Sequence, residues 1–348
     1  MPSNPWGITP LNWSNLVAEA IRRRKQEKLT QKEHAALASV SIPTIVAFDR
    51  GERTLSLAKA FDILRVVGLV EEPSQEGAQE AFVQEAFTRW RDLTASLPQD
   101  SPGRFPYGWY RIDYALEGDL KPIDLAPFEN LLRDAVIRHT GWPMFLFPGR
   151  PELEPKEIDG VIECWLKPED AGIERPFGDA AHCDFWRVTP TGRAFIMRGY
   201  QEDGQDTFPP KTIFDTTLPT WRLGEALLHA EALAIHLAQS PDDVKVRLRV
   251  LYTGLTGRVL RSWANPMTDL FMEGGAARSD EAMLETEVPV EKINDKLAIY
   301  LHPLIASLFE RFGVTGLSLE RVEAELDRMK ANRFGSLRSA PPPRRRPS

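Results

Sequence analysis

Apolar and polar residues over the first seventy positions follow the three- and four-residue spacing of amphipathic helices, with little of the alternation that marks a strand. This spacing predicts one helix from about Leu16 to Leu29 and a shorter one over 57–67. We therefore expect residues 14–70 to form an all-α domain, preceded by an N-terminal arm over 1–13.

Capping residues mark two further helices between these two. Thr30 followed by Glu33 is the pattern of a capping box, which predicts a helix start. Ser41 before Pro43 predicts the next start, because serine caps a helix and proline is tolerated in its first turn. Gly51 predicts the end of that helix, since a left-handed residue there is least costly as glycine. The pattern thus predicts two short helices separated by a tight bend.

The pattern changes beyond residue 70. A helical stretch is followed by a segment rich in proline and glycine, and then by helices mixed with strand-like runs such as the alternating residues 244–251. The predicted fold is multidomain, with an α+β C-terminal domain built on a mainly antiparallel sheet. We predict a connecting helix over 71–97 and a linker over 98–124. An α+β sensor or assembly domain follows over 125–331, and a disordered basic tail over 332–348.

Composition indicates the class of protein. The 348 residues are 42% hydrophobic and include two cysteines, which cannot form a disulfide scaffold. No apolar run reaches the roughly 18 residues of a membrane span, and the N-terminus lacks the pattern of a signal peptide. We therefore expect a cytoplasmic protein with no membrane partner.

Charge is distributed unevenly along the chain, although the net value is only −7. Residues 1–70 carry ten Lys and Arg against six Asp and Glu, and the tail from Arg328 carries seven basic residues and no acidic one. The stretch between them is strongly acidic. A basic first segment is what a domain that binds a polyanion needs.

The segment from Leu29 to Gly51 carries the functional argument. Ala35 stands where two crossing helices would approach so closely that a larger side chain would clash. Val40, Ile45 and Phe48 would fill the space between the helices. Two short helices packed in this way form a helix-turn-helix, whose second helix enters the DNA major groove.

The same segment closely resembles the Cro/repressor-like (XRE) family of bacterial and phage regulators. The resemblance covers residues 14–70, a fifth of the chain. Ser39 stands where the family usually has glycine, and Asp49 where glutamate is more frequent. The matching motifs are Leu29-Thr30-Gln31, Ala35, the turn Ser39-Val40-Ser41, Thr44-Ile45 and Asp49-Arg50-Gly51.

The resemblance implies a role for each matching residue. The residues implied to contact phosphates are Gln31, Lys32, Arg50 and Arg53. Ser41 is either a further phosphate contact or the helix cap. The residues implied to face base edges are Ile42, Pro43, Thr44, Val46 and Ala47. Because most of these are apolar, the implied recognition uses thymine methyl groups, Thr44 and DNA shape.

Members of this family bind two half-sites as a dimer, so the resemblance implies a homodimer on double-stranded DNA, located at the nucleoid. The helix at 76–97 carries an apolar stripe that includes Phe82, Phe87 and Trp90. That stripe is a candidate dimer surface, and packing against the C-terminal domain is an equal alternative.

The C-terminal region shows no motif that predicts catalysis, a metal or a cofactor, so we expect none of the three. Its aromatic residues are either core or the wall of a pocket for a small-molecule effector. The candidate pocket residues are Trp165, Phe185, Trp186, Tyr200 and Trp221. Residues 141–143, 198–203 and 262–266 are similar to a C-terminal module of uncharacterised bacterial proteins that also carry DNA-binding domains.

The favoured interpretation is a non-enzymatic, sequence-specific transcriptional regulator, expected to act as a repressor, whose C-terminal domain senses a signal or builds the oligomer. Two alternatives stay open. One is an antitoxin or defence-system regulator whose C-terminal domain binds a partner protein. The other is an enzyme targeted to DNA, with an acidic metal site near Asp159 and Glu163.

Overall fold

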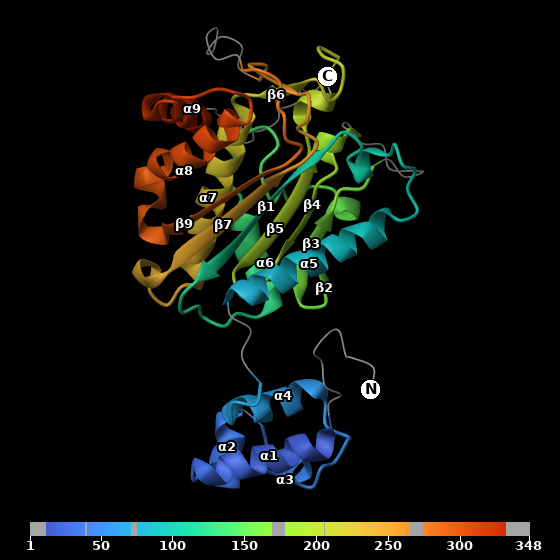
Figure 1. The fold of residues 1–348 in the computed structure, drawn as a ribbon, viewed down its shortest axis with the longest axis vertical. Coiled ribbons are helices and arrows are strands. Elements are labelled where there is room, and N and C mark those ends of the chain that lie inside the picture. Colours follow the sequence, from blue (N-terminus) through green and yellow to red (C-terminus); the bar gives the residue numbers. More distant parts are fainter. Residues whose placement is uncertain are drawn as a thin grey trace, which may run out of the picture. The chain divides into compact units, whose positions relative to one another are not determined.

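A computed structural model describes residues 12–38, 40–70, 75–168, 178–204, 206–264 and 274–331 (Figure 1). The chain divides into two compact units, Met1–Ala78 and Gln79–Ser348. The predictions for the N-terminal arm up to residue 11, for Ser39 and for the tail over 332–348 lie outside the described residues.

Residues 12–70 of the N-terminal unit are helical, with no strand among them. The capping box between Thr30 and Glu33 is present, and the Ser41 side chain accepts a hydrogen bond from the Thr44 backbone. Gly51 has a φ of 73° and directly follows the last helical turn, as predicted. The helices are α1 (Trp13–Gln26), α2 (Gln31–Leu37), α3 (Ile42–Asp49) and α4 (Leu57–Val66).

The interior of this unit is made of small and aliphatic side chains around one phenylalanine. Ala35, Ile45 and Phe48 are buried as expected, at 2%, 0% and 0% exposure. Trp13 packs edge-on against Phe48 and donates to the Gly51 carbonyl at 3.0 Å. The predicted arm therefore ends one residue too late, because Trp13 begins α1 and packs against the buried residues. The buried cluster comprises Val17, Ala20, Ala35, Ala38, Ile45, Phe48, Ile63, Leu64 and Val67.

The C-terminal unit is built on a seven-stranded sheet with the order β2-β3-β4-β5-β1-β7-β9. Every neighbouring pair in it is antiparallel, which confirms the mainly antiparallel sheet of the predicted fold class. A separate parallel pair joins β6 (Ile213–Asp215) to β8 (Val259–Arg261). The strands of the large sheet are β1 (Trp109–Glu117), β2 (Lys156–Ile158), β3 (Val161–Trp165), β4 (Phe185–Val188), β5 (Arg193–Gly199), β7 (Lys245–Tyr252) and β9 (Ala282–Pro289).

The linker predicted over 98–124 is wrong, because this segment contains β1, an inner strand between β5 and β7. Its residues are buried on both faces of the sheet. The charged residues Arg111 and Asp113 form an ion pair with each other at 2.7 Å. Asp113 also accepts from Arg249 of β7 at 3.0 Å. Partners that are distant in sequence therefore make this strand compatible with burial.

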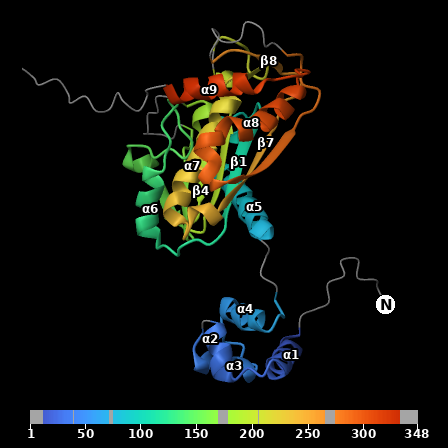
Figure 2. The same cartoon turned by 90° about the vertical axis from the view of Figure 1, so that its left-hand side faces the viewer.

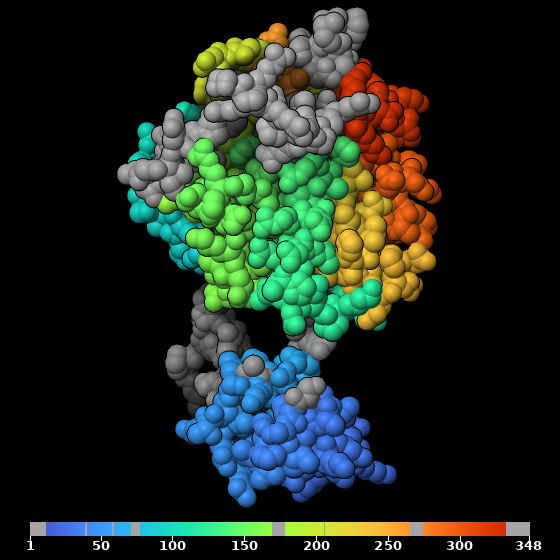
Figure 3. Space-filling model, turned by 180° about the vertical axis from the view of Figure 1, so that it is seen from behind, coloured from blue at the N-terminus to red at the C-terminus, as the bar shows by residue number. Residues whose placement is uncertain are grey.

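Helices cover both faces of the sheet, as Figures 1 and 2 show. One face carries α6 (Leu125–Asp134), α7 (Leu218–Leu237) and α8 (Ile293–Glu310), and α9 (Leu319–Ala331) packs on α7 and α8. Figure 3 views this side, where α6, α7 and α8 follow one another from green through yellow to orange. The opposite face carries α5 (Gln75–Thr94). No described helix is long and apolar enough to cross a membrane.

The apolar stripe of α5 packs on the sheet. Phe82, Val83 and Ala86 lie in one cluster with Phe185 and Phe195 of the sheet. Polar contacts frame this cluster, since Gln79 donates to Asp113 at 3.0 Å and Arg89 bonds Glu163 at 3.1 Å. The prediction of a dimer surface on this stripe is therefore wrong, and the alternative of packing against the C-terminal domain is confirmed.

Candidate functional site

Helix α3 presents the residues implied to read DNA on the side opposite its buried residues. Ile45 and Phe48 point into the unit, whereas Ile42 is 47% exposed and Pro43 and Arg50 are also exposed. Thr44, Val46 and Ala47 are half-buried. Two of the five residues implied to face base edges are therefore exposed, and their contact with DNA stays a prediction.

Ser41 acts as the cap of α3. Its hydroxyl accepts from the Thr44 backbone N–H at 3.4 Å and lies 2.8 Å from the Thr44 hydroxyl. This pair of hydroxyls lies at the solvent-exposed N-terminus of α3. The capping role of Ser41 is therefore present in the structure, and a phosphate contact stays a prediction.

The basic residues of the N-terminal unit fall into two groups. Arg22, Arg24 and Arg65 are all paired with carboxylates of the same unit. In contrast, Lys32, Arg50 and Arg53 are exposed and form no ion pair within the described part of the chain, and the same holds for Lys25, Lys28 and Lys59. Their charges are therefore not neutralised by neighbouring side chains, as a phosphate contact requires.

Gln31 and Asp49 belong to a small network that fixes α2 and α3 on α1. Arg24 bonds Asp49 with two hydrogen bonds of 2.8 and 2.7 Å, and Gln31 donates to the same carboxylate at 2.6 Å. Gln31, the first residue of α2, is thus held against Asp49 at the end of α3. Sequence reasoning missed the role of Arg24, because its partner lies 25 positions away and no periodic pattern connects the two.

The aromatic pocket predicted for the C-terminal domain is wrong in four of its five residues. Phe185 and Trp186 are neighbours in β4, so their side chains lie on opposite faces of the sheet. Trp165 belongs with Phe185 to the cluster under α5, whereas Trp186 is fully buried and donates to the Leu146 carbonyl at 3.3 Å. Trp221 donates to the Glu325 carbonyl at 3.1 Å. Tyr200 alone of the five lines the cavity described next.

A cavity lies where the start of β1, the ends of β5 and β7 and the first turn of α7 meet. The short helices η3 (Ala180–His182) and η4 (Gln201–Gly204) complete its wall. Its free volume is about 20 Å³, which is the space for about one water molecule. The lining residues are Tyr110, Trp142, Ala181, His182, Arg198, Tyr200, Gln201, Glu202, Phe214, Leu218, Pro219, Arg222 and Tyr252.

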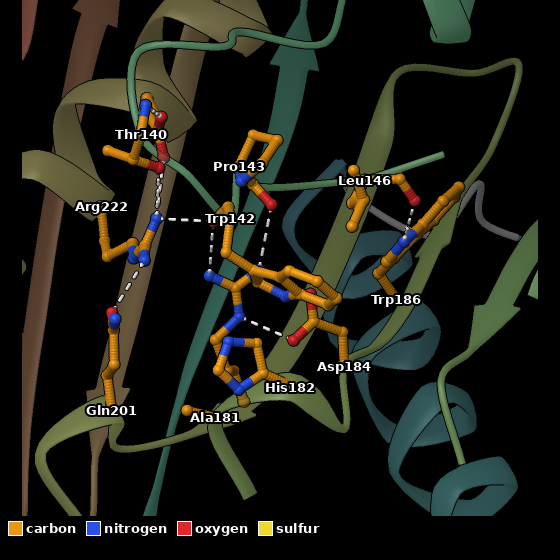
Figure 4. Close-up of polar contacts among 12 residues, drawn as sticks. Thr140, Trp142, Pro143, Leu146, Ala181, His182, Asp184, Trp186, Gln201 and Arg222 are labelled. Atoms are coloured by element: carbon orange, nitrogen blue, oxygen red, sulfur yellow. Dashed lines mark hydrogen bonds and ion pairs between the residues drawn. The ribbon is translucent and has the colours of Figure 1, made fainter. Parts of the chain in front are cut away.

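Two buried arginines support one side of this cavity. Arg198 bonds Asp184 at 2.7 Å and the Pro143 carbonyl at 3.0 Å. The Asp184 carboxylate also accepts from the Trp142 indole at 3.1 Å. This bidentate pair neutralises the Arg198 charge and holds the Trp142 ring at the cavity, beside His182 (Figure 4).

The second arginine, Arg222 on α7, connects the segment before Trp142 to the helix. It donates to the Thr140 hydroxyl and the Trp142 carbonyl, both at 2.7 Å, and to Gln201 at 3.3 Å (Figure 4). Its charge is neutralised by Glu225 at 3.1 Å. Both arginines are therefore occupied by protein groups.

Glu202 lines the cavity, and two further acids, Asp203 and Asp215, lie next to it. Asp215 accepts four backbone N–H bonds, including those of Leu218 at 2.7 Å and Trp263 at 2.8 Å. Arg258 lies 4.3 Å from the centre of the Tyr200 ring and forms an ion pair with Asp203. Burial, followed by the nearby Asp215 carboxylate, raises the pKa of Glu202 to about 8. Ionisation of Glu202 is consequently disfavoured in the folded chain.

Sequence reasoning did not identify Glu202, Arg222 or Asp215 as site residues, because they occur singly and not in a motif.

His182, Cys183 and Asp184, which are adjacent in sequence, diverge as neighbouring side chains must: His182 pairs with Asp179 at 2.8 Å and Asp184 with Arg198. Glu163 of the proposed nuclease-like site bonds both Arg89 and Arg187. Across the described ranges, no three His, Cys, Asp or Glu side chains gather to hold a metal ion.

Comparisons of the chain with protein-family models, curated proteins and solved structures found no match. The functional argument therefore depends on the geometry of the two units.

Proposed function

We propose that this protein is a sequence-specific DNA-binding transcriptional regulator. Its N-terminal unit acts as a helix-turn-helix that inserts α3 into the major groove, and its C-terminal unit senses a signal or builds the oligomer. The observation that carries this proposal is that Lys32 on α2, Arg50 at the end of α3 and Arg53 shortly after it are exposed and form no ion pair among the described residues.

The chemistry of α3 supports recognition by apolar contact. Ile42 and Pro43 are exposed at its N-terminus and cannot form hydrogen bonds with base edges through their side chains. Apolar side chains in the major groove contact the thymine methyl group. We therefore propose operators rich in A·T pairs, with additional selection by DNA shape.

The oligomer is proposed to be a homodimer, since one such unit makes few contacts and two half-sites lie about 34 Å apart on DNA. The apolar stripe of α5 is buried against the sheet, so the dimer must use another surface. The protein is proposed to repress transcription at the nucleoid.

Binding of the full-length protein to DNA from upstream of its own gene tests the proposal. Scrambled DNA of equal length serves as the control, near physiological salt. We expect a preference of a hundredfold or more for the upstream fragment. Equal binding to both fragments would leave only electrostatic attraction, and no binding to either would favour the alternative in which the protein binds a protein partner.

Two substitutions separate positioning from recognition. Arg50→Ala should weaken binding to all sequences and reduce the slope of log affinity against log salt by about one, because it removes one phosphate contact. Thr44→Ala should instead reduce the preference among sequences. Lys59→Ala, at an exposed lysine on α4, is the matched control for loss of a positive charge. Equal losses from Arg50→Ala and Thr44→Ala on every sequence would contradict these roles.

A further inference from the structure

Glu202 is a buried acid without a cationic partner. Its side chain is 4% exposed, and one oxygen accepts from the Asp215 backbone N–H at 3.1 Å. None of the ion pairs in the described residues includes it. The neighbouring acids are stabilised differently, since Asp203 pairs with Arg258 and Asp215 accepts four backbone N–H bonds. A buried carboxyl group without such compensation is costly to ionise.

Tyr252 provides a second, independent observation at the same cavity. Its side chain is 2% exposed and lines the cavity, and its hydroxyl has no hydrogen-bond partner among the described residues. Glu202 lines the same cavity, and burial, followed by the nearby Tyr110 and Glu202, raises the pKa of Tyr252. Buried hydroxyl groups are normally hydrogen-bonded, so this group is available to a ligand.

The rest of the wall is aromatic, with charges that already have partners. Rings from Tyr110, Trp142, Tyr200 and Phe214 line the cavity beside Tyr252. The charges of Arg198 and Arg222 are neutralised by carboxylates of the protein, as described above. Glu202 is therefore the ionisable side chain of the wall whose negative charge a cationic ligand would neutralise. The free volume of about 20 Å³ limits the bound group to about the size of a water molecule.

We propose that this cavity binds the primary ammonium group of a small cationic ligand. The Glu202 carboxylate is its ionic partner, the Tyr252 hydroxyl oxygen accepts a hydrogen bond from it, and the aromatic rings provide cation–π contacts. Trp142, Gln201 and Leu218 are half-buried and form the mouth through which the remainder of the ligand reaches solvent. This site does not depend on the proposed DNA binding.

Binding is expected to be coupled to proton release. Glu202 has a pKa of about 8 and must lose its proton to pair with an ammonium group. Asp215 and Asp203 oppose this ionisation and Arg258 favours it, while Arg198, Arg222 and His182 face the same cavity. Below pH 8 the apparent affinity should therefore fall about tenfold for each pH unit.

Calorimetric titration of the full-length protein with methylammonium chloride tests the site. We expect saturable binding at pH 9 and a Kd about tenfold higher at pH 7. Sodium chloride and sodium acetate at equal ionic strength should not bind, and tetramethylammonium should be too large. Saturable binding of acetate, or no saturable binding of methylammonium by the folded protein at pH 9, would overturn the proposal.

Three variants locate the binding. Glu202→Gln should abolish methylammonium binding together with its pH dependence. Tyr252→Phe should weaken binding about fivefold to tenfold and keep the pH dependence, because it removes one hydrogen bond. Glu310→Gln, at an exposed position at the end of α8, is the matched control and should bind as the unmodified chain does. Unchanged binding by Glu202→Gln would contradict the assignment even if the other variants behaved as expected.

Discussion

The two units stabilise their interiors by different means. Residues 12–70 bury mainly a cluster of small and aliphatic side chains with one buried arginine–carboxylate pair, Arg24 with Asp49, and the helices begin and end at local capping residues. The C-terminal unit buries several such pairs, among them Arg198 with Asp184 and Arg258 with Asp203. Its contacts also span long stretches of chain, since Tyr114 lies 2.8 Å from His229, 115 positions away.

This difference separates what local sequence specifies from what only the assembled fold specifies. A capping box acts within four residues, so its effect is present in a fragment of the chain. A buried arginine is tolerated only after its partner has been placed beside it by other elements. Substitutions at helix caps and at buried arginines should therefore differ in the change of unfolding free energy and in how much of the chain they affect.

The largest expected effect is that of Arg198→Met. The substitution leaves the Asp184 carboxylate buried with the Trp142 indole as its remaining donor among the contacts described above. We expect the free energy of unfolding of the C-terminal unit to fall by about 3–5 kcal/mol, because an uncompensated buried charge remains. Hydrogen exchange of the full chain, followed by mass spectrometry, measures the two units separately.

The control for this variant is Lys245→Met, which breaks an exposed ion pair with Glu287. Its cost should stay below about 1 kcal/mol. A cost for Arg198→Met no larger than that of the control would show that the buried pair is dispensable. Faster exchange in residues 12–70 would show that the two units do not respond independently.

A pH-dependent effect is expected for Glu202→Gln, which is small in acid and approaches that of Arg198→Met only as the pH nears 8. The folded pKa of about 8 lies above the ordinary value of 4.5, so Glu202 contributes stability below pH 4.5 that is lost as the pH rises through 8. Glutamine does not ionise, so the variant does not lose stability over this pH range. The stability difference, variant minus unmodified chain, should therefore grow by about 1.4 kcal/mol per pH unit over this range.

Urea unfolding at a series of pH values, monitored in the C-terminal unit, measures this difference. Glu310→Gln should show no such slope, since its side chain is exposed. A flat difference for Glu202→Gln would mean that the carboxyl group ionises as freely in the folded chain as in the unfolded one.

The smallest expected effect is that of Thr30→Ala in the N-terminal unit. It removes the hydroxyl that accepts from the Glu33 backbone at 3.2 Å and should cost about 1 kcal/mol. Faster hydrogen exchange should be limited to residues 12–70. Thr54→Ala, at an exposed threonine outside the helices, should change little by comparison. An effect of Thr30→Ala that reached the C-terminal sheet would contradict the separation of local from long-range contributions.

The sequence was sufficient for the elements that local signals define. Thr30, Ser41 and Gly51 placed the boundaries of α2 and α3 because each acts on backbone groups within a few residues. The alternation over 244–251 placed β7 within one residue, since polar and apolar faces of that strand differ in burial. These features require no knowledge of distant partners.

The sequence was insufficient where distant residues change the meaning of a local pattern. Prolines and glycines before β1 made the segment resemble a linker, whereas in the fold Arg249 and Gln79, distant in sequence, bond its buried Asp113. Phe185 and Trp186 seemed suited to one pocket, but their strand places them on opposite faces. The cavity at Glu202 has no sequence motif, because its wall is collected from six separate segments of chain.

The position of β1 in the sheet also has a consequence for how the protein is made. This strand is synthesised before both of its neighbours, and its backbone at Trp109 bonds Thr253, 144 residues later. During synthesis β1 therefore has no neighbouring strand to pair with until β5 and β7 have left the ribosome, whereas the N-terminal unit is already able to fold. During that interval the nascent C-terminal unit is the part of the chain that most needs protection from aggregation by chaperones.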